Sequence, residues 1–174
     1  MCVIIVKPAG RNLPSYETLK ACSYCNPHGF GFATSRGIYK SMDFETFYDF
    51  LISNVKKSDA CIIHFRYATH GSRCKRNCHP FAHGDLFFAH NGILNVEPIG
   101  DLTDSETAFR EYIVPVYDKY GLDSKNFNQT VYKLLGASKF AFLKGNRIKT
   151  YGAFASRDGL LYSNLRHEYI FQYM

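Results

Sequence analysis

The most reactive combination of residue types in this chain stands at its start, where Cys2 follows Met1 and precedes the apolar run from Val3 to Val6. Cysteine is small enough for an initiator methionine before it to be removed, so we expect a mature chain that begins with a thiol and a free α-amine. The ordinary pKa values of these groups, about 8.5 and about 7.7–8.0, let the amine accept the thiol proton near neutral pH. Taken alone, the dipeptide equally fits an unreactive cysteine at a strand edge.

Three other positions could complete a site for acyl transfer from an amide, which needs oxyanion donors and charges that hold the substrate's ends. Asn91-Gly92 follows a short apolar run and offers a side-chain NH₂ and an unobstructed backbone N–H. Arg66 follows another apolar run, and its planar guanidinium suits a carboxylate. Asp104 could bind an ammonium. Together these groups would hold an α-amino acid such as glutamine while a thiol attacks its side-chain amide.

Each of these residues also has a structural interpretation. Asn91-Gly92 is the residue pair of the commonest hairpin turn, Asp104 could cap a helix with or without a second role, and Arg66 could form a structural ion pair. We favour the functional interpretation because several groups in complementary roles support one another.

The hydrophobic pattern predicts the elements that must position these residues. Between Ser72 and Asp85 periodicity is lost, which predicts a long loop, and such loops are often lids or binding loops. The order of strands, then helices, then strands favours two packed sheets with helices outside them over a parallel α/β sheet. The expected strands are 3–7, 30–33, 38–40, 60–65, 86–89, 140–144, 147–152 and 160–163; the expected helices are 16–21, 44–55, 104–120 with a kink near Pro115, and 128–135.

Composition narrows the class of protein. The 174 residues, 46% of them hydrophobic, fit one compact domain over residues 1–174. The start lacks the charged and apolar regions of a signal peptide, and no stretch is long enough to span a bilayer, so we expect a cytoplasmic protein without membrane contact. The net charge of +6 is spread along the chain, which makes nucleic-acid binding an unlikely function.

The six cysteines predict reduced thiols, because disulfide frameworks belong mainly to secreted chains. Zinc is an alternative for four of them, Cys22, Cys25, Cys74 and Cys78, with His79 as a fifth ligand. We expect no metal site and no cofactor, and leave the zinc alternative open.

Five motifs follow one another over roughly the first 110 residues. They are Met1-Cys2, Arg66-Tyr67-Ala68-Thr69-His70-Gly71, Asn77-Cys78-His79-Pro80-Phe81, His90-Asn91-Gly92-Ile93 and Thr103-Asp104-Ser105-Glu106. In this order they resemble the class II glutamine amidotransferases, which are N-terminal-nucleophile hydrolases. The chain departs from the usual family pattern at Val3, where glycine commonly follows the nucleophile.

The resemblance implies an α+β fold, namely the four-layer αββα sandwich of two mainly antiparallel sheets that N-terminal-nucleophile hydrolases adopt. It implies that Cys2 is the nucleophile, that its α-amine is the base, and that Asn91 and Gly92 form the oxyanion hole. It also implies a flap from Thr69 to His79 that closes over the substrate, with His79 shaping the flap or the pocket. The implied substrate-binding residues are Arg66, Thr69, His70, Gly92 and Asp104, with Arg66 and Thr69 at the α-carboxylate of glutamine and Asp104 at its α-amine.

The function implied is a glutaminase that hydrolyses the side-chain amide of L-glutamine through a cysteine thioester. The resulting ammonia would pass to a separate synthase, because the sequence shows no synthase domain. Two alternatives stay open: an N-terminal-nucleophile amidase acting on another γ-glutamyl or acylated amide, and a non-catalytic binding or zinc module.

Overall fold

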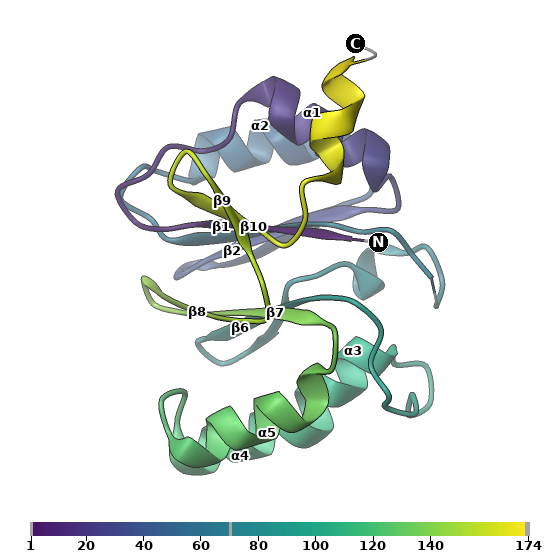
Figure 1. Cartoon of the computed structure of the whole chain (residues 1–174), viewed down its shortest axis with the longest axis vertical. Helices are drawn as coiled ribbons and strands as arrows, with labels where there is room; N and C mark the ends of the chain where they lie inside the picture. The colour runs from purple at the N-terminus through teal and green to yellow at the C-terminus, as the bar shows by residue number, and fades with distance from the viewer. Residues whose placement is uncertain (1, 70, 173–174) are drawn as a thin grey trace.

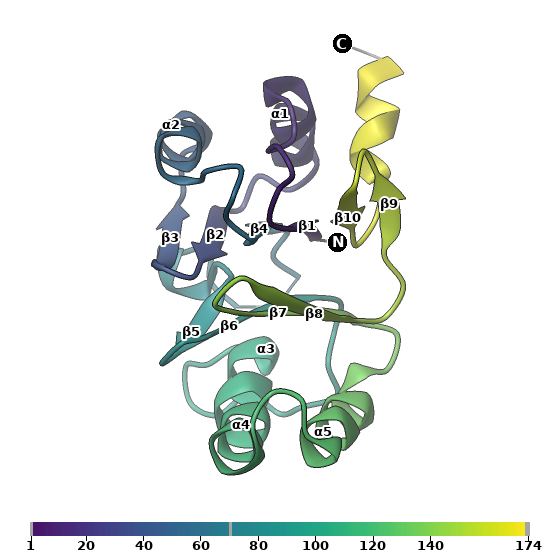
Figure 2. The same ribbon diagram turned by 90° about the vertical axis from the view of Figure 1, so that its left-hand side faces the viewer.

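The computed structural model describes residues 2–69 and 71–172, and the chain folds into four layers, two sheets face to face with helices outside each (Figures 1 and 2). The expectations for Met1 and His70 lie outside the described residues. The helices over the first sheet are α1 (Tyr16–Cys25), α2 (Phe44–Asn54) and the 3₁₀ helix η3 (Arg166–Gln172). Those over the second are α3 (Asp104–Thr107), the π-helical turn η2 (Ala108–Ile113), α4 (Val114–Tyr120) and α5 (Lys125–Leu135).

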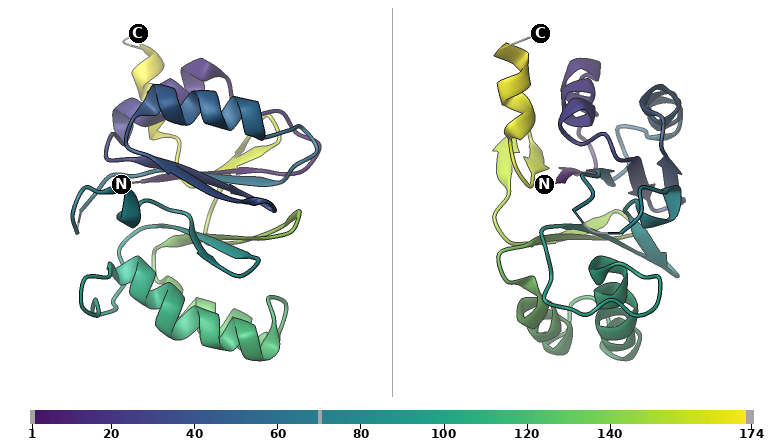
Figure 3. Two further views of the ribbon diagram at one scale, coloured as in Figure 1. Left: turned by 180° about the vertical axis from the view of Figure 1, so that it is seen from behind. Right: turned by 90° about the vertical axis from the view of Figure 1, so that its right-hand side faces the viewer.

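Both sheets are antiparallel throughout their described pairings, as predicted. The six-stranded sheet has the order β3 (Gly37–Ser41), β2 (Phe30–Thr34), β4 (Cys61–Phe65), β1 (Val3–Lys7), β10 (Leu160–Tyr162) and β9 (Ala155–Arg157). The four-stranded sheet has the order β5 (Phe81–His83), β6 (Leu86–Asn91), β7 (Lys139–Lys144) and β8 (Arg147–Tyr151). Seen from behind, the two sheets face each other, with α1 and α2 outside the first and α3, α4 and α5 outside the second (Figure 3).

The alternation of side chains along β1 builds two different hydrophobic layers. Val3 and Ile5 face the helices α1 and α2, among aromatic residues such as Phe47. Ile4 and Val6 face the second sheet, where the neighbours are mostly small or aliphatic, and these four side chains are at most 1% exposed. Because both faces of β1 are buried, the strand reads as a continuous apolar run and holds the start of the chain firmly.

Strand register brings the predicted site residues to one edge of the sandwich. Val3 of β1 is paired with Phe65 of β4, so Cys2 and Arg66 lie just beyond the same end of the two strands. Asn91 ends β6 in the facing sheet, and contacts between β1 and β6 hold the two sheets together there.

Several elements differ from the sequence prediction. The segment 72–85 is not wholly a loop, since it contains the 3₁₀ turn η1 (Lys75–Asn77) and the short edge strand β5. The helix 104–120 widens into a π-helical turn before Pro115, which lies near the start of α4. Among the described residues, no helix is both long enough and apolar enough to cross a membrane.

Candidate active site

Residues from five separate segments line a small pocket at this edge, with a volume of about 40 Å³. That volume has room for one or two water molecules. The predicted site residues that line it are Cys2, Arg66, Thr69, His79, Gly92 and Asp104. The structure thus brings together residues that are up to 102 positions apart in the sequence.

The Cys2 thiol is held against the segment that follows β4. The backbone N–H of Tyr67 donates to Sγ at 3.3 Å, and the thiol lies 3.5 Å from the Tyr67 carbonyl. Burial raises the pKa of the Cys2 thiol, while the Tyr67 hydrogen bond and the positive charge of Arg66 act in the opposite direction. The ionised thiol is therefore not the resting form at neutral pH, and attack requires a proton acceptor.

Arg66 is only 4% exposed, and part of its guanidinium fixes the flap. Its Nη1 donates to the Ser72 carbonyl at 2.9 Å, and Asn77 Nδ2 donates to the same oxygen at 3.1 Å. The ring of His28 holds the backbone just before the flap, because its Nδ1 accepts the Ala68 N–H at 2.9 Å. Nothing in the local sequence around His28 indicates this contact, which joins residues 40 positions apart.

Asp104 lies at the pocket wall as the first residue of α3. Thr103, and not Asp104, caps this helix, because the Thr103 hydroxyl accepts the Glu106 N–H. The Asp104 carboxylate instead accepts the Leu94 N–H at 2.9 Å and the Ser105 N–H at 2.7 Å. The Asp104 carboxylate therefore joins the loop after Asn91 to the start of α3. Asp104 also lines the pocket.

The two residues predicted as oxyanion donors occupy different positions. Gly92 lines the pocket and has a φ of +149°, and a Cβ at this position would collide with the hydroxyl of Ser138. Asn91 is 2% exposed and does not line the pocket; its Nδ2 donates to Ser163 Oγ at 2.9 Å. Glycine is required at 92 by both the backbone conformation and the close approach.

Three buried histidines lie beside the pocket and between the sheets. His64 Nε2 is 3.1 Å from the His90 carbonyl, and His90 Nδ1 is 2.7 Å from Ser105 Oγ. The ring of His79 packs 4.5 Å from that of His64, centroid to centroid. Burial lowers the pKa of all three, to about 3 for His64 and about 4 for His90, so this wall of the pocket is uncharged at neutral pH.

The cysteines considered for zinc do not converge. Cys22 and Cys25 lie on α1, whereas Cys74 and Cys78 flank η1 in the flap. Within residues 2–69 and 71–172, no group of three or more His, Cys, Asp or Glu side chains is arranged to hold a metal ion.

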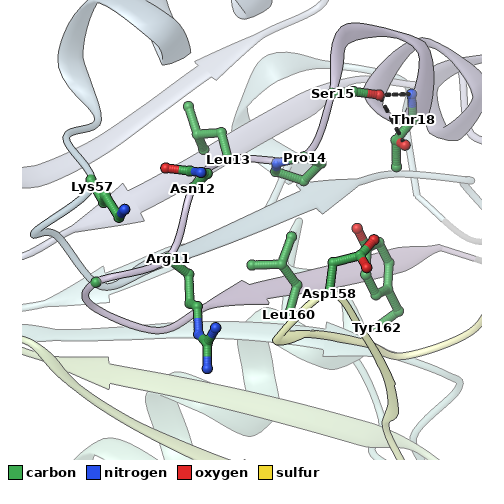
Figure 4. Close-up of a pocket in the computed structure, with 11 residues that line it drawn as sticks. Arg11, Asn12, Leu13, Pro14, Ser15, Thr18, Lys57, Asp158, Leu160 and Tyr162 are labelled. Atoms are coloured by element: carbon green, nitrogen blue, oxygen red, sulfur yellow. Dashed lines mark hydrogen bonds between the residues drawn. The ribbon is translucent and has the colours of Figure 1, made fainter.

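A larger pocket, about 320 Å³, lies toward the other end of β1 (Figure 4). Its lining includes the basic residues Arg11 and Lys57 and the apolar or aromatic residues Leu160 and Tyr162. None of the described residues that line it is a predicted site residue, so a larger volume does not mark the predicted site.

Comparison with known proteins agrees with the geometry. The family described as class-II glutamine amidotransferases matches residues 46–143. The chain is 36% identical over 86 residues to the probable glutamine amidotransferase DUG3 of Saccharomyces cerevisiae. It is also 32% identical over 117 residues to the isomerizing glutamine–fructose-6-phosphate aminotransferase of Bacillus licheniformis. These matches cover 40% and 60% of the chain, but only 24% and 20% of the two relatives.

A solved structure has the same fold. The glutamine phosphoribosylpyrophosphate amidotransferase of B. subtilis, complexed with ADP and GMP, superimposes with a TM-score of 0.60 at 18% identity. The superposition covers 93% of this chain and 41% of the other. The αββα sandwich of the N-terminal-nucleophile hydrolases, predicted from the motifs, is thereby confirmed.

Proposed function

The chain belongs to the class II glutamine amidotransferases, and on that premise we propose that it hydrolyses the side-chain amide of L-glutamine at Cys2 to give glutamate and ammonia. The observation that supports this most directly is that Cys2, Gly92 and Asp104 line one pocket with Arg66. A nucleophile, an oxyanion donor and two opposite charges meet there, which is the set that a side-chain amide of an α-amino acid requires.

In the proposed reaction the α-amine of a mature chain that begins at Cys2 takes the thiol proton as sulfur attacks the amide carbon. The oxyanion of the tetrahedral intermediate accepts hydrogen bonds from Gly92 N–H and Asn91 Nδ2. The C–N bond then breaks, and ammonia leaves with the proton held by the amine. Water, deprotonated by the same amine, hydrolyses the thioester to glutamate and restores the thiol.

The charged ends of glutamine are assigned to opposite walls. Arg66 and Thr69 bind the α-carboxylate, and Asp104 binds the α-ammonium, a role for which its carboxylate is already oriented by two backbone N–H groups. A pocket of about 40 Å³ is too small for the substrate, so the flap from Thr69 to His79 opens to admit it. Opening has to break hydrogen bonds that join the flap to the rest of the chain, among them those from Arg66 Nη1 to the Ser72 carbonyl and from Lys40 Nζ to the Arg76 carbonyl.

We also propose that the ammonia passes to an acceptor domain or enzyme outside the sandwich that the described residues form. The acceptor chemistry and the partner are not specified by the site.

The test is the release of glutamate and ammonia from L-glutamine by the purified protein. Cys2→Ala should abolish release, whereas Cys25→Ser, a change at a partly exposed thiol of α1, should leave it within twofold. Equal release by the wild type and Cys2→Ala would remove Cys2 from the mechanism. Absence of release by the wild type would direct the search to other γ-glutamyl amides.

Intact mass of the mature protein provides an independent check on the base. We expect a chain lighter than the encoded sequence by one methionine. A retained Met1 would block the amine of Cys2 and contradict the proposed proton transfers.

A further inference from the structure

Two residues directly after β10, Ser163 and Asn164, contact the start of the chain. Ser163 is 3% exposed, and Asn164 is partly buried. The backbone N–H of Ser163 donates to the Ile4 carbonyl at 2.9 Å, and Asn164 Nδ2 donates to the Cys2 carbonyl at 2.7 Å. The residue that carries the thiol is thus held by a side chain from the far end of the sequence.

The Ser163 hydroxyl joins the nucleophile's strand to Asn91. Its oxygen accepts the Ile4 N–H at 2.8 Å and Asn91 Nδ2 at 2.9 Å. With one proton of the Asn91 NH₂ directed to Ser163, the plane of the amide is set and the second proton is left for another acceptor. One hydroxyl therefore fixes the orientation of the Asn91 amide relative to β1, the strand that directly follows Cys2.

These contacts replace the backbone ladder where it ends. The described pairing of β1 with β10 joins Ile5 to Tyr162 and Val6 to Leu161, and no strand pair continues it toward Cys2. Beyond Tyr162 one backbone hydrogen bond, from Ser163 N–H to the Ile4 carbonyl, extends the ladder. The Ser163 hydroxyl and Asn164 Nδ2 bind the Ile4 N–H and the Cys2 carbonyl, which further strand pairing would otherwise have satisfied. The backbone of Cys2 can thus diverge from the sheet toward the pocket without losing its fixed position.

We propose that Ser163 and Asn164 are positioning residues for the glutaminase reaction, which fix the Cys2 backbone and the Asn91 amide relative to each other. The inference rests on the proposed roles of Cys2 and Asn91. Neither positioning residue lines the pocket, so both act through the groups that they hold. Misplacement of reacting groups by about 1 Å can cost about 10²-fold in rate, whereas substrate binding by other residues is little affected.

The kinetic test compares variants at position 163. Ser163→Ala should lower kcat by about 10-fold or more and leave KM within about threefold, because Arg66 and Asp104 still bind the substrate. Ser163→Thr keeps the hydroxyl and should restore most of kcat. Ser156→Ala, on the exposed strand β9, is the matched control and should behave as the wild type.

Asn164 is tested by an isosteric change. Asn164→Asp removes the donor to the Cys2 carbonyl and brings two carboxylate oxygens to it, so it should lower kcat at least as much as Asn164→Ala. An active wild type with unchanged kcat in Ser163→Ala and Asn164→Asp would overturn the inference and leave the glutaminase function standing.

A second readout does not depend on the substrate. In ¹H–¹⁵N spectra the side-chain amide of Asn91, assigned by its loss in Asn91→Asp, should exchange slowly in the wild type. Exchange should be at least about 10-fold faster in Ser163→Ala and near the wild-type rate in Ser163→Thr. Fast exchange in the wild type, or no change in Ser163→Ala, would overturn the positioning role even if glutamine proved not to be the substrate.

Discussion

Asp104 and Asn91 lie close in sequence but should contribute to different kinetic constants. Asp104 presents its carboxylate at the pocket, where it attracts an ammonium equally in the ground state and the transition state. Asn91 is buried, and in the proposed mechanism its contribution to catalysis arises only when an oxyanion forms.

We therefore expect Asp104→Asn to raise KM by about 10-fold or more with kcat within about threefold, and Asn91→Ala to lower kcat by about 10²–10³ with little change in KM. Asparagine is chosen at 104 because its carbonyl can still accept the Leu94 N–H, whereas alanine would also release that loop. Steady-state kinetics with glutamine measure both constants. The reverse pattern would show that the two roles have been exchanged.

Residue types in short motifs predicted most of the residues that line the pocket, but not the residues that hold them in place. Cys2, Arg66, Gly92 and Asp104 were identified because each follows or begins a recognisable element. Ser163 carried no such signal, since an isolated serine after a short strand is ordinary and its partner Ile4 lies 159 positions away. Asp104 was considered as a helix cap, and the structure assigns that role to Thr103.

At the scale of elements, β2 and the end of the flap meet at Gly31. A Cβ on Gly31 would collide with the carbonyl oxygen of His79, a residue of the pocket wall. The close contact positions the end of the flap against the first sheet. A side chain at this position must therefore disturb both the packing and the pocket.

Gly31→Ala should lower stability by about 1–3 kcal/mol and also lower kcat/KM for glutamine. Gly84→Ala is the control: its Cβ would meet no atom of the described residues within 4 Å, and its φ of +54° costs only about 1–2 kcal/mol. Urea unfolding and steady-state kinetics separate the two effects. Full kcat/KM in Gly31→Ala would show that the contact does not shape the pocket.

Among the elements, the long apolar runs were predicted best. β1 and β4 are buried on both faces, so their sequences are apolar except for Lys7 and His64. β5 and β9 are three-residue edge strands with exposed positions, and their formation depends on pairing with β6 and β10. Local sequence holds little information about such pairing. The sequence predicted a kink near Pro115, and the structure has a π-helical turn directly before α4.

At the scale of the whole molecule, the buried histidines make stability depend on pH. His64 and His90 have pKa values lowered by burial to about 3 and about 4, and that of His79 is lowered as well. The positive charges of Arg66 and Lys40 add to this effect at His64, whereas Asp104 opposes it at His90. Between pH 6.5 and 4 the unfolded chain binds more protons than the folded one, so stability is full above pH 6.5 and falls as pH is lowered.

We expect the free energy of unfolding to drop by about 2 kcal/mol per buried histidine between pH 7.5 and 5, where most carboxylates stay ionised. Urea titrations across this range measure the slope. His64→Gln, which removes one buried ring, should reduce the slope. A midpoint that does not move between pH 7.5 and 5 would contradict the prediction.

The placement of β1 between β4 and β10 also affects when the site can form during synthesis of the chain. Cys2 is made long before Ser163 and Asn164, which follow it by 161 and 162 positions and contact its end of β1. At about 5–20 residues per second this interval is roughly 10–30 s. During it a nascent chain carries Cys2 without these contacts, so under the proposed mechanism we expect glutaminase activity only in chains that extend past Asn164 and not in proportion to the length made.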